Sequence, residues 1–157
     1  MMANIRERLT QLGIDLPQVV PPVAAYTPAV AHGGYVYTSG QLPMIAGALP
    51  ATGKVGEGTD LVSPTDAKDY ARACALNALA AVESVIGSLD RITRVVKVVG
   101  FVASDPSFTG QPAVINGASE ILGEIFGESG VHARSAVGVA VLPLDAPVEV
   151  EITVAYE

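Results

Sequence analysis

Arg134 is the residue best suited to chemistry in this sequence, because it is the only basic side chain among the last sixty residues, which also hold eight acids. It opens an alternating apolar run that ends at Leu142 and is typical of a β-strand. On the two-residue period of a strand it shares a face with three residues too small to fill the space beside it, Ala136, Gly138 and Ala140. A guanidinium beside such a hollow suits a planar carboxylate. The alternative is an edge-strand arginine that reaches solvent or pairs with a neighbouring acid.

A second candidate strand near the C-terminus carries two acids, Glu149 and Glu151, that alternate with apolar residues. Either both acids point to solvent from a half-buried strand, or one of them holds a water for a reaction. If a turn at Pro143–Pro147 joins the two strands as a hairpin, Glu149 lies opposite Val141 and about 23 Å along the strand from Arg134. A site that uses both residues then requires a bulged hairpin or contributions from two subunits.

The other potentially reactive residues form no recognisable motif. His32 precedes a Gly-Gly turn and His132 lies near the start of a strand; either could polarise a substrate, but such histidines are usually solvent contacts. Cys74 fits a small buried thiol inside an Ala-rich helix. Ser39 lacks the first glycine of a nucleophile elbow, and residues 53–58 lack the ending of a phosphate-binding loop. We expect no metal site and no cofactor.

The composition predicts one domain over residues 1–157, with residues 1–20 as an N-terminal extension. Because the chain is 50% hydrophobic and only 16% charged, some apolar surface is expected to be buried between subunits. A net charge of −7 without a Lys and Arg cluster argues against a nucleic-acid partner. A single cysteine, no secretory h-region and no 18-residue apolar span indicate a cytoplasmic protein that does not associate with membranes.

Capping signals and periodicity place the helices. A short helix is expected over residues 4–12. A longer one has Ser63 as N-cap, Pro64 in its first turn and Gly87 as its stop. A further helix runs from about Pro112 to just before Gly127.

Strands are predicted in the segments that remain, and their ranges are Tyr35–Ser39, a short one near Lys54–Val55, Ile92–Ala103, Arg134–Leu142 and Val148–Tyr156. The near-continuous β-branched residues of 92–103 predict a strand covered on both faces. The last two strands are expected to form a hairpin. This order predicts an α+β fold with a single sheet and two helices packed on one face.

Two motifs resemble the signature of a known family. They are Thr38-Ser39-Gly40-Gln41-Leu42-Pro43, and Ala133-Arg134-Ser135-Ala136-Val137 followed by Leu142-Pro143 and Val148-Glu149-Val150-Glu151. They are similar to the Rid family of reactive intermediate deaminases, also called the YjgF family, and the resemblance covers roughly residues 20–157. It implies a chorismate-mutase-like α+β fold and a homotrimer with its sites in the clefts between subunits.

The resemblance also implies roles for individual residues. Arg134 corresponds to the arginine that binds the substrate carboxylate, and Glu149 to the acid near the reacting water. Ser39 and Gly40 match hydroxyl and backbone contacts to the substrate.

Three further positions border the family's pocket, namely Tyr26, Asn116 and Ala136. Ala136 stands where many relatives have cysteine, so only a backbone role remains for it. The longer N-terminus and the enlarged Leu42–Val62 loop depart from the family pattern and could reshape the pocket.

The activity that the resemblance implies is hydrolysis of a small carboxylate-bearing imine or enamine, such as 2-aminoacrylate, to a 2-keto acid and ammonia. It needs no cofactor, because orientation of an electrophilic imine beside water supplies much of the rate. One alternative is a non-catalytic module that senses a keto acid through the same arginine pocket. The other is a ribonuclease, which the acidic composition disfavours.

Overall fold

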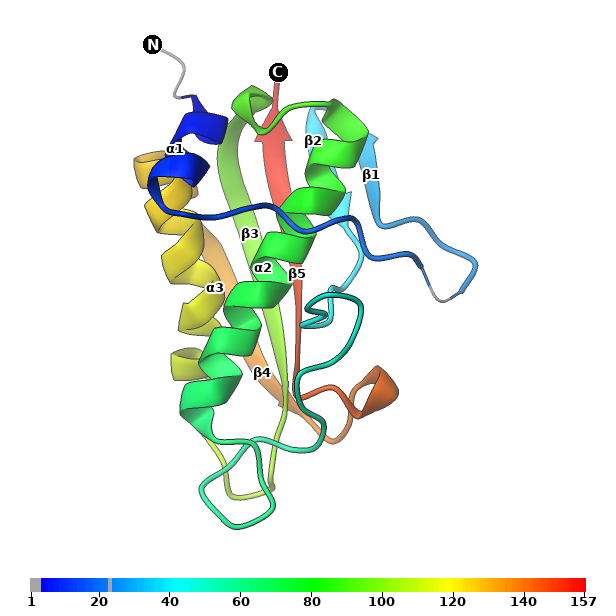
Figure 1. Ribbon diagram of the computed structural model, residues 1–157, viewed down its shortest axis with the longest axis vertical. Helices are drawn as coiled ribbons and strands as arrows, with labels where there is room; N and C mark the ends of the chain where they lie inside the picture. Colours follow the sequence, from blue (N-terminus) through cyan, green and yellow to red (C-terminus); the bar gives the residue numbers. More distant parts are fainter. Residues whose placement is uncertain (1–3, 23) are drawn as a thin grey trace.

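The computed structural model describes residues 4–22 and 24–157, and its helices and strands form an α+β arrangement (Figure 1). Three short 3-10 segments accompany them, η1 (Leu89–Arg91), η2 (Gly127–Gly130) and η3 (Pro143–Asp145). The main elements in chain order are α1 (Ile5–Gln11), β1 (Ala29–His32), β2 (Tyr35–Thr38), α2 (Pro64–Ile86), β3 (Ile92–Ala103), α3 (Gln111–Phe126), β4 (Ala133–Val139) and β5 (Val148–Tyr156).

The five strands form one sheet in the order β1-β2-β5-β3-β4. Strand β4 runs parallel to β3, and the other neighbouring pairs are antiparallel. The predicted hairpin between the last two strands is therefore wrong, because β3 lies between them. The physical reason is that α3 carries the chain from β3 back to a parallel β4, so β5 can reach β3 only on its other side.

Two smaller strand predictions are also corrected. The first strand of the sheet is β1, a stretch not predicted as a strand, which pairs with β2 through the Gly33-Gly34 turn. The expected strand near Lys54–Val55 is reduced to isolated bridges from Val55 to Val62 and to Ser104.

The caps expected for the longest helix are present. The Ser63 hydroxyl accepts a hydrogen bond from the Asp66 N–H at 3.1 Å, and Gly87 ends α2 at a φ of 86°. Helices α2 and α3 lie side by side on one face of the sheet (Figure 1). They approach so closely that a Cβ at Gly117 would collide with the Lys68 carbonyl oxygen. This contact fixes α3 relative to α2.

Among the residues that the structure describes, no helix lies over the opposite face of the sheet (Figure 1). The cover predicted for β3 on both faces is therefore partial in the single chain, where Val99 and Phe101 on that face are half-buried. Four apolar side chains on that face are each between 40% and 50% exposed, and they are Val30, Tyr35, Tyr37 and Val137. We call this surface the open face. Within residues 4–22 and 24–157, no helix has the length and apolar character needed to cross a membrane.

Candidate functional site

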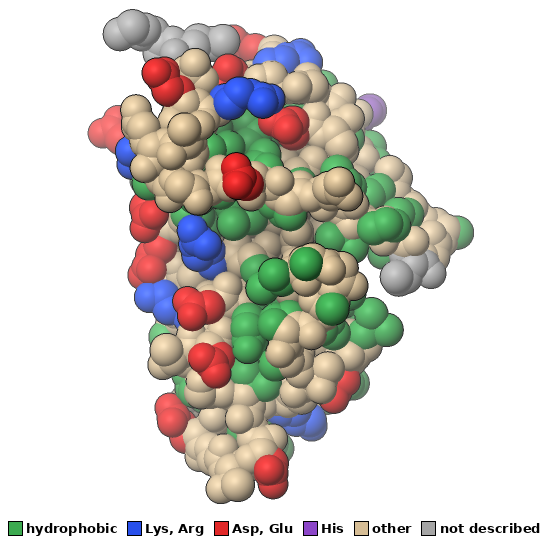
Figure 2. Space-filling model, in the orientation of Figure 1, with side chains coloured by type: hydrophobic (Ala, Val, Ile, Leu, Met, Phe, Trp, Pro, Cys, Tyr) green, Lys and Arg blue, Asp and Glu red, His purple; other side chains and the backbone are tan. Residues whose placement is uncertain are grey.

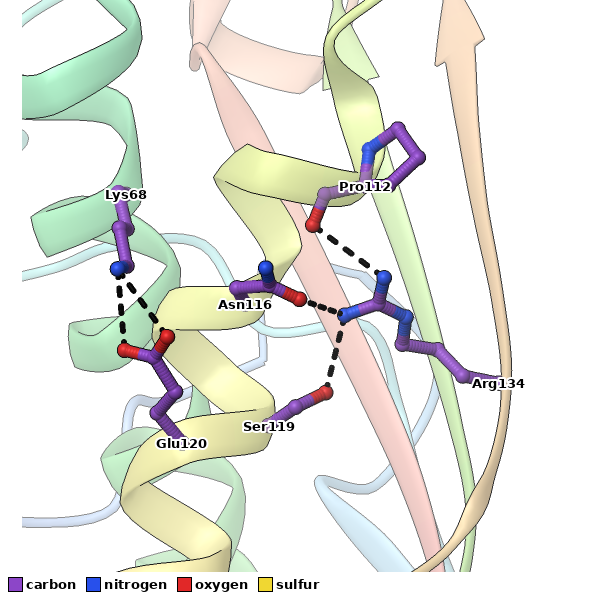
Figure 3. Close-up of polar contacts among 6 residues, drawn as sticks. All are labelled: Lys68, Pro112, Asn116, Ser119, Glu120 and Arg134. Atoms are coloured by element: carbon purple, nitrogen blue, oxygen red, sulfur yellow. Dashed lines mark hydrogen bonds and ion pairs between the residues drawn. The ribbon is translucent and has the colours of Figure 1, made fainter.

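Arg134 lies on the helix-covered side of the edge strand β4. It is in register with Val98 of β3, which is fully buried beneath the helices. Its guanidinium reaches α3 (Figure 3): Nη1 donates to Asn116 Oδ1 at 2.8 Å and to Ser119 Oγ at 3.1 Å, and Nη2 donates to the Pro112 carbonyl at 3.3 Å. Arg134 and Asn116, two of the candidate site residues, are therefore in direct contact.

The three acceptors share one stripe of α3, because Pro112, Asn116 and Ser119 are spaced by four and three residues. Across the helix, Glu120 forms an ion pair with Lys68 of α2 at 3.0 Å (Figure 3). Helix α3 is thus held by α2 on one side and presents its acceptors to Arg134 on the other.

Part of the Arg134 guanidinium is left for a ligand. Three of its five N–H donors are engaged, and Nε and one Nη2 hydrogen have no partner among the described residues. Within residues 4–22 and 24–157, no carboxylate lies within 4.0 Å of it, so the alternative of a pairing with a neighbouring acid is not met. Two parallel donors on one edge match the two oxygens of a carboxylate.

Glu149 lies on the open face of β5. Its neighbours Val148 and Val150 are fully buried on the helix side, so the intervening side chain points the other way. Its carboxylate rests against Gly40, where an added Cβ would lie 2.6 Å from Glu149 Cδ and still closer to Oε1. Burial raises the pKa of Glu149 above its ordinary value, and the negative charge of Glu151 raises it further.

The Gly40 segment is fixed beside β5 by backbone pairing. Gln41 exchanges both hydrogen bonds with Val150, at 2.8 and 3.0 Å. The Ser39 hydroxyl donates to the Thr27 carbonyl at 2.6 Å, so towards a substrate it can only accept. Tyr26 and Gly40 line a small cavity of about 40 Å³.

The predicted site residues therefore form two clusters. Ala136 follows Arg134 on the helix side, in register with Gly100, and belongs with Arg134 and Asn116. Their shared stripe on α3 and β4 is called the arginine cluster. Tyr26, Ser39, Gly40 and Glu149 form the second group, the glutamate cluster.

The two clusters do not meet within one chain. Glu149 is in register with Phe101 and Arg134 with Val98, which separates them by about 10 Å along the strands and about 10 Å across two strand spacings. Their side chains also leave opposite faces of the sheet. A bulged hairpin could have joined them, but no hairpin links β4 and β5.

Two residues that the sequence interpretation missed join the arginine cluster. The sequence left His132 between polarising a substrate and contacting solvent; in the structure its Nε2 lies 2.8 Å from Ser119 Oγ and its Nδ1 lies 2.6 Å from the Gly130 carbonyl. Ser119 could have been found from the sequence, because it stands three residues after Asn116 on the same helical stripe.

Cys74 is buried as predicted, and burial raises the pKa of its thiol well above the ordinary value. It therefore lacks the thiolate character of a reactive cysteine. Over the part of the chain that the structure describes, no group of three or more His, Cys, Asp or Glu side chains is placed to hold a metal ion.

Comparison with known proteins places this geometry in a family. Residues 6–154 match a family model described as "YjgF/chorismate mutase-like", and the description also carries the word endoribonuclease. The chain belongs to the YjgF family. It is 43% identical over 154 residues to protein TCP17 of Trypanosoma cruzi, covering 96% of this chain and 93% of that protein.

Two further relatives of the YjgF family are informative. Over 144 residues the chain is 33% identical to the 2-iminobutanoate/2-iminopropanoate deaminase of Dermatophagoides farinae, covering 92% of this chain and 95% of the relative. A crystal structure of a protein of unknown function from Agrobacterium tumefaciens is 43% identical and superposes with a TM-score of 0.87, covering 98% and 92% of the two chains. The expected chorismate-mutase-like α+β fold is confirmed.

Proposed function

We propose that this YjgF-family protein hydrolyses 2-imino acids and their enamine tautomers, of the 2-aminoacrylate type, to 2-keto acids and ammonia. The observation that carries the proposal is the state of Arg134, whose Nη1 is fixed by α3 while Nε and one Nη2 hydrogen remain without a partner among the described residues. Such an edge binds a carboxylate through two parallel hydrogen bonds. The similarity to an imine deaminase over 92% of the chain supports the same substrate class.

Glu149 supplies the second part of the chemistry. Water adds to the imine carbon while Glu149 takes one of its protons and passes it to the imine nitrogen, which gives a carbinolamine. Glu149 then takes the hydroxyl proton of the carbinolamine and delivers it to the amine nitrogen, so the carbon–oxygen double bond forms as the carbon–nitrogen bond breaks and ammonia leaves. A carboxylate whose pKa is raised is a stronger base once ionised, which suits this role. The products are a keto acid and ammonia, so no oxidant and no cofactor enters the balance.

A complete site requires a second copy of the chain. The arginine and glutamate clusters lie on opposite faces of one sheet, and the open face exposes the apolar side chains of Val30, Tyr37 and Val137. In the proposed homotrimer, open faces pack together and the glutamate cluster of one copy approaches the arginine cluster of the next. This packing would also add walls to the small cavity beside Gly40.

The main rival is a binding module that holds a keto acid without turning over an imine, because the free edge of Arg134 fits either ligand. A ribonuclease gains little support from the charge distribution. On the face seen in Figure 2, Lys and Arg side chains are scattered among acids and form no patch that would follow a phosphate backbone.

The test is a coupled assay in which an amino-acid oxidase generates the imine and keto-acid release is timed with and without this protein. The wild-type protein should accelerate release, and Arg134→Ala should abolish the acceleration while the protein stays folded. Arg72→Ala, which removes an exposed cation on α2, is the matched control and should behave as wild type. A folded wild type that binds 2-oxobutanoate but leaves the rate of imine hydrolysis unchanged would establish the binding module instead.

A further inference from the structure

His132 and Ser119 form a directed pair of hydrogen bonds beside Arg134. The Gly130 carbonyl 2.6 Å from His132 Nδ1 can only accept, so Nδ1 carries the hydrogen. In the neutral ring Nε2 is then an acceptor, and the Ser119 hydroxyl at 2.8 Å donates to it.

This direction decides what Ser119 offers to Arg134. Because the serine hydrogen points to His132, a lone pair of Oγ is turned to Arg134 Nη1, which donates to it at 3.1 Å. Nη1 also donates to Asn116 Oδ1, so both of its hydrogens are engaged by α3. The Gly130 carbonyl thus orients His132, His132 orients Ser119, and Ser119 orients Arg134.

Besides Ser119, two other groups of α3 hold Arg134, namely Asn116 Oδ1 and the Pro112 carbonyl. Its neighbours on the same strand face are Ala136 and Gly138, and neither can pack along a four-bond side chain. A long flexible side chain loses considerable rotamer entropy when it is held in one geometry, so hydrogen bonds at its far end are the available means of fixing it.

We infer that His132 and Ser119 are positioning residues for the proposed carboxylate site, holding the Nη1 end of Arg134 so that its Nε–Nη2 edge faces the substrate. The inference rests on the proposed function. Neither residue touches the reacting carbon, so both act on substrate binding rather than on the chemical step.

The experiment measures KM and kcat for imine hydrolysis together with the dissociation constant of 2-oxobutanoate by calorimetry. Ser119→Ala should raise KM and the dissociation constant about 10-fold, equivalent to about 1.4 kcal/mol, with kcat nearly unchanged. Ser119→Thr keeps the hydroxyl and should restore most of the affinity. Ser84→Ala, which removes a hydroxyl on α2 that donates to the Ala81 carbonyl, is the control and should match wild type.

A double-mutant cycle separates positioning from a general structural effect. His132→Ala should raise KM by a smaller factor than Ser119→Ala, and the double variant should be no worse than Ser119→Ala, because His132 acts only through Ser119. Additive losses, or a loss in kcat equal to that in KM, would overturn the positioning role.

The same measurements distinguish this inference from the proposed function. An active wild type with an unaffected Ser119→Ala overturns the positioning role alone. A wild type that neither hydrolyses the imine nor binds 2-oxobutanoate overturns both. If Ser119→Ala does not fold, the comparison of His132→Ala with His132→Gln, which retains an acceptor, decides: equal KM values would refute the pair.

Discussion

Replacing Gly40 with alanine would insert a methyl group into the space that the Glu149 carboxylate occupies. The new Cβ would lie 2.6 Å from Glu149 Cδ and 3.0 Å from Cγ, whereas carbon atoms in contact sit about 3.5–4.0 Å apart. The φ angle of Gly40 is not among the positive values, so an alanine is not strained there by its backbone. The expected effect is therefore displacement of the Glu149 side chain.

The size of the effect follows from that displacement. Moving Cδ from 2.6 Å to about 3.5 Å shifts the carboxylate by about 0.9 Å. A misplacement of about 1 Å in a catalytic group can cost about 100-fold in rate. We therefore expect kcat to fall by about two orders of magnitude, while keto-acid affinity, which depends on Arg134, changes little.

The assay is the coupled measurement of keto-acid release, run on Gly40→Ala and on a matched glycine variant. Gly123→Ala is the control, because a Cβ there meets nothing within 4 Å and an alanine in a helix interior is favourable. It should keep full activity and unfold at a temperature no lower than wild type. Gly40→Ala should also stay folded, since the clash is with a side chain that can move towards the open face.

The result that would refute this reasoning comes from combining Gly40→Ala with Glu149→Gln. If Gly40 acts only through the position of Glu149, then Gly40→Ala should cost almost nothing more once Glu149→Gln has removed the base. A further 100-fold loss in the double variant would mean that Gly40 contributes something other than space for the carboxylate. Wild-type activity in Gly40→Ala itself would show that the position of Glu149 does not matter.

Three further outcomes are expected. Arg134→Lys keeps the charge but lacks the forked donors, so KM in the coupled assay should rise about 10- to 100-fold, and near-normal values would exclude a bidentate grip. Burial and the charge of Glu151 raise the pKa of Glu149, so kcat/KM should begin to fall at a pH above the ordinary carboxyl range as Glu149 becomes protonated. Glu151→Gln should move this acid limb of the pH profile to lower pH and leave the plateau unchanged. An acid limb that does not move would contradict the assignment of Glu149 as the base. Light scattering should return about three times the 16.1 kDa chain mass, and a fully active monomer would refute the shared site.

The helices and most strands could be predicted from the sequence because their signals are local. Ser63 as N-cap, Gly87 as stop and the β-branched run of β3 each act within a few residues, and the structure has them as predicted. The strands that β4 and β5 pair with could not be predicted in the same way. It depends on where α3 returns the chain, which is a property of packing between distant segments.

The same distinction between local signals and packing of distant segments applies to the candidate site. Arg134 and Asn116 could each be proposed as site residues from the family resemblance, and the structure joins them by a 2.8 Å hydrogen bond. His132 could not be placed, because its role depends on Ser119 thirteen residues earlier and on a carbonyl that η2 turns towards it. No sequence pattern around an isolated histidine near a strand end predicts such partners.

Under the proposed function, the opposite placement of Arg134 and Glu149 makes hydrolysis depend on assembly. Each residue is already positioned in the single chain. Hydrogen bonds to α3 hold Arg134, and Glu149 packs against Gly40 and has a raised pKa. The position of neither residue depends on the other, because the two residues lie on different faces of one sheet. An isolated chain should therefore retain measurable carboxylate binding at Arg134 yet lack hydrolysis, and dilution below the trimer dissociation constant should reduce kcat more steeply than keto-acid affinity. If both fall together on dilution, assembly also holds Arg134 in place, and the braces from α3 are not sufficient.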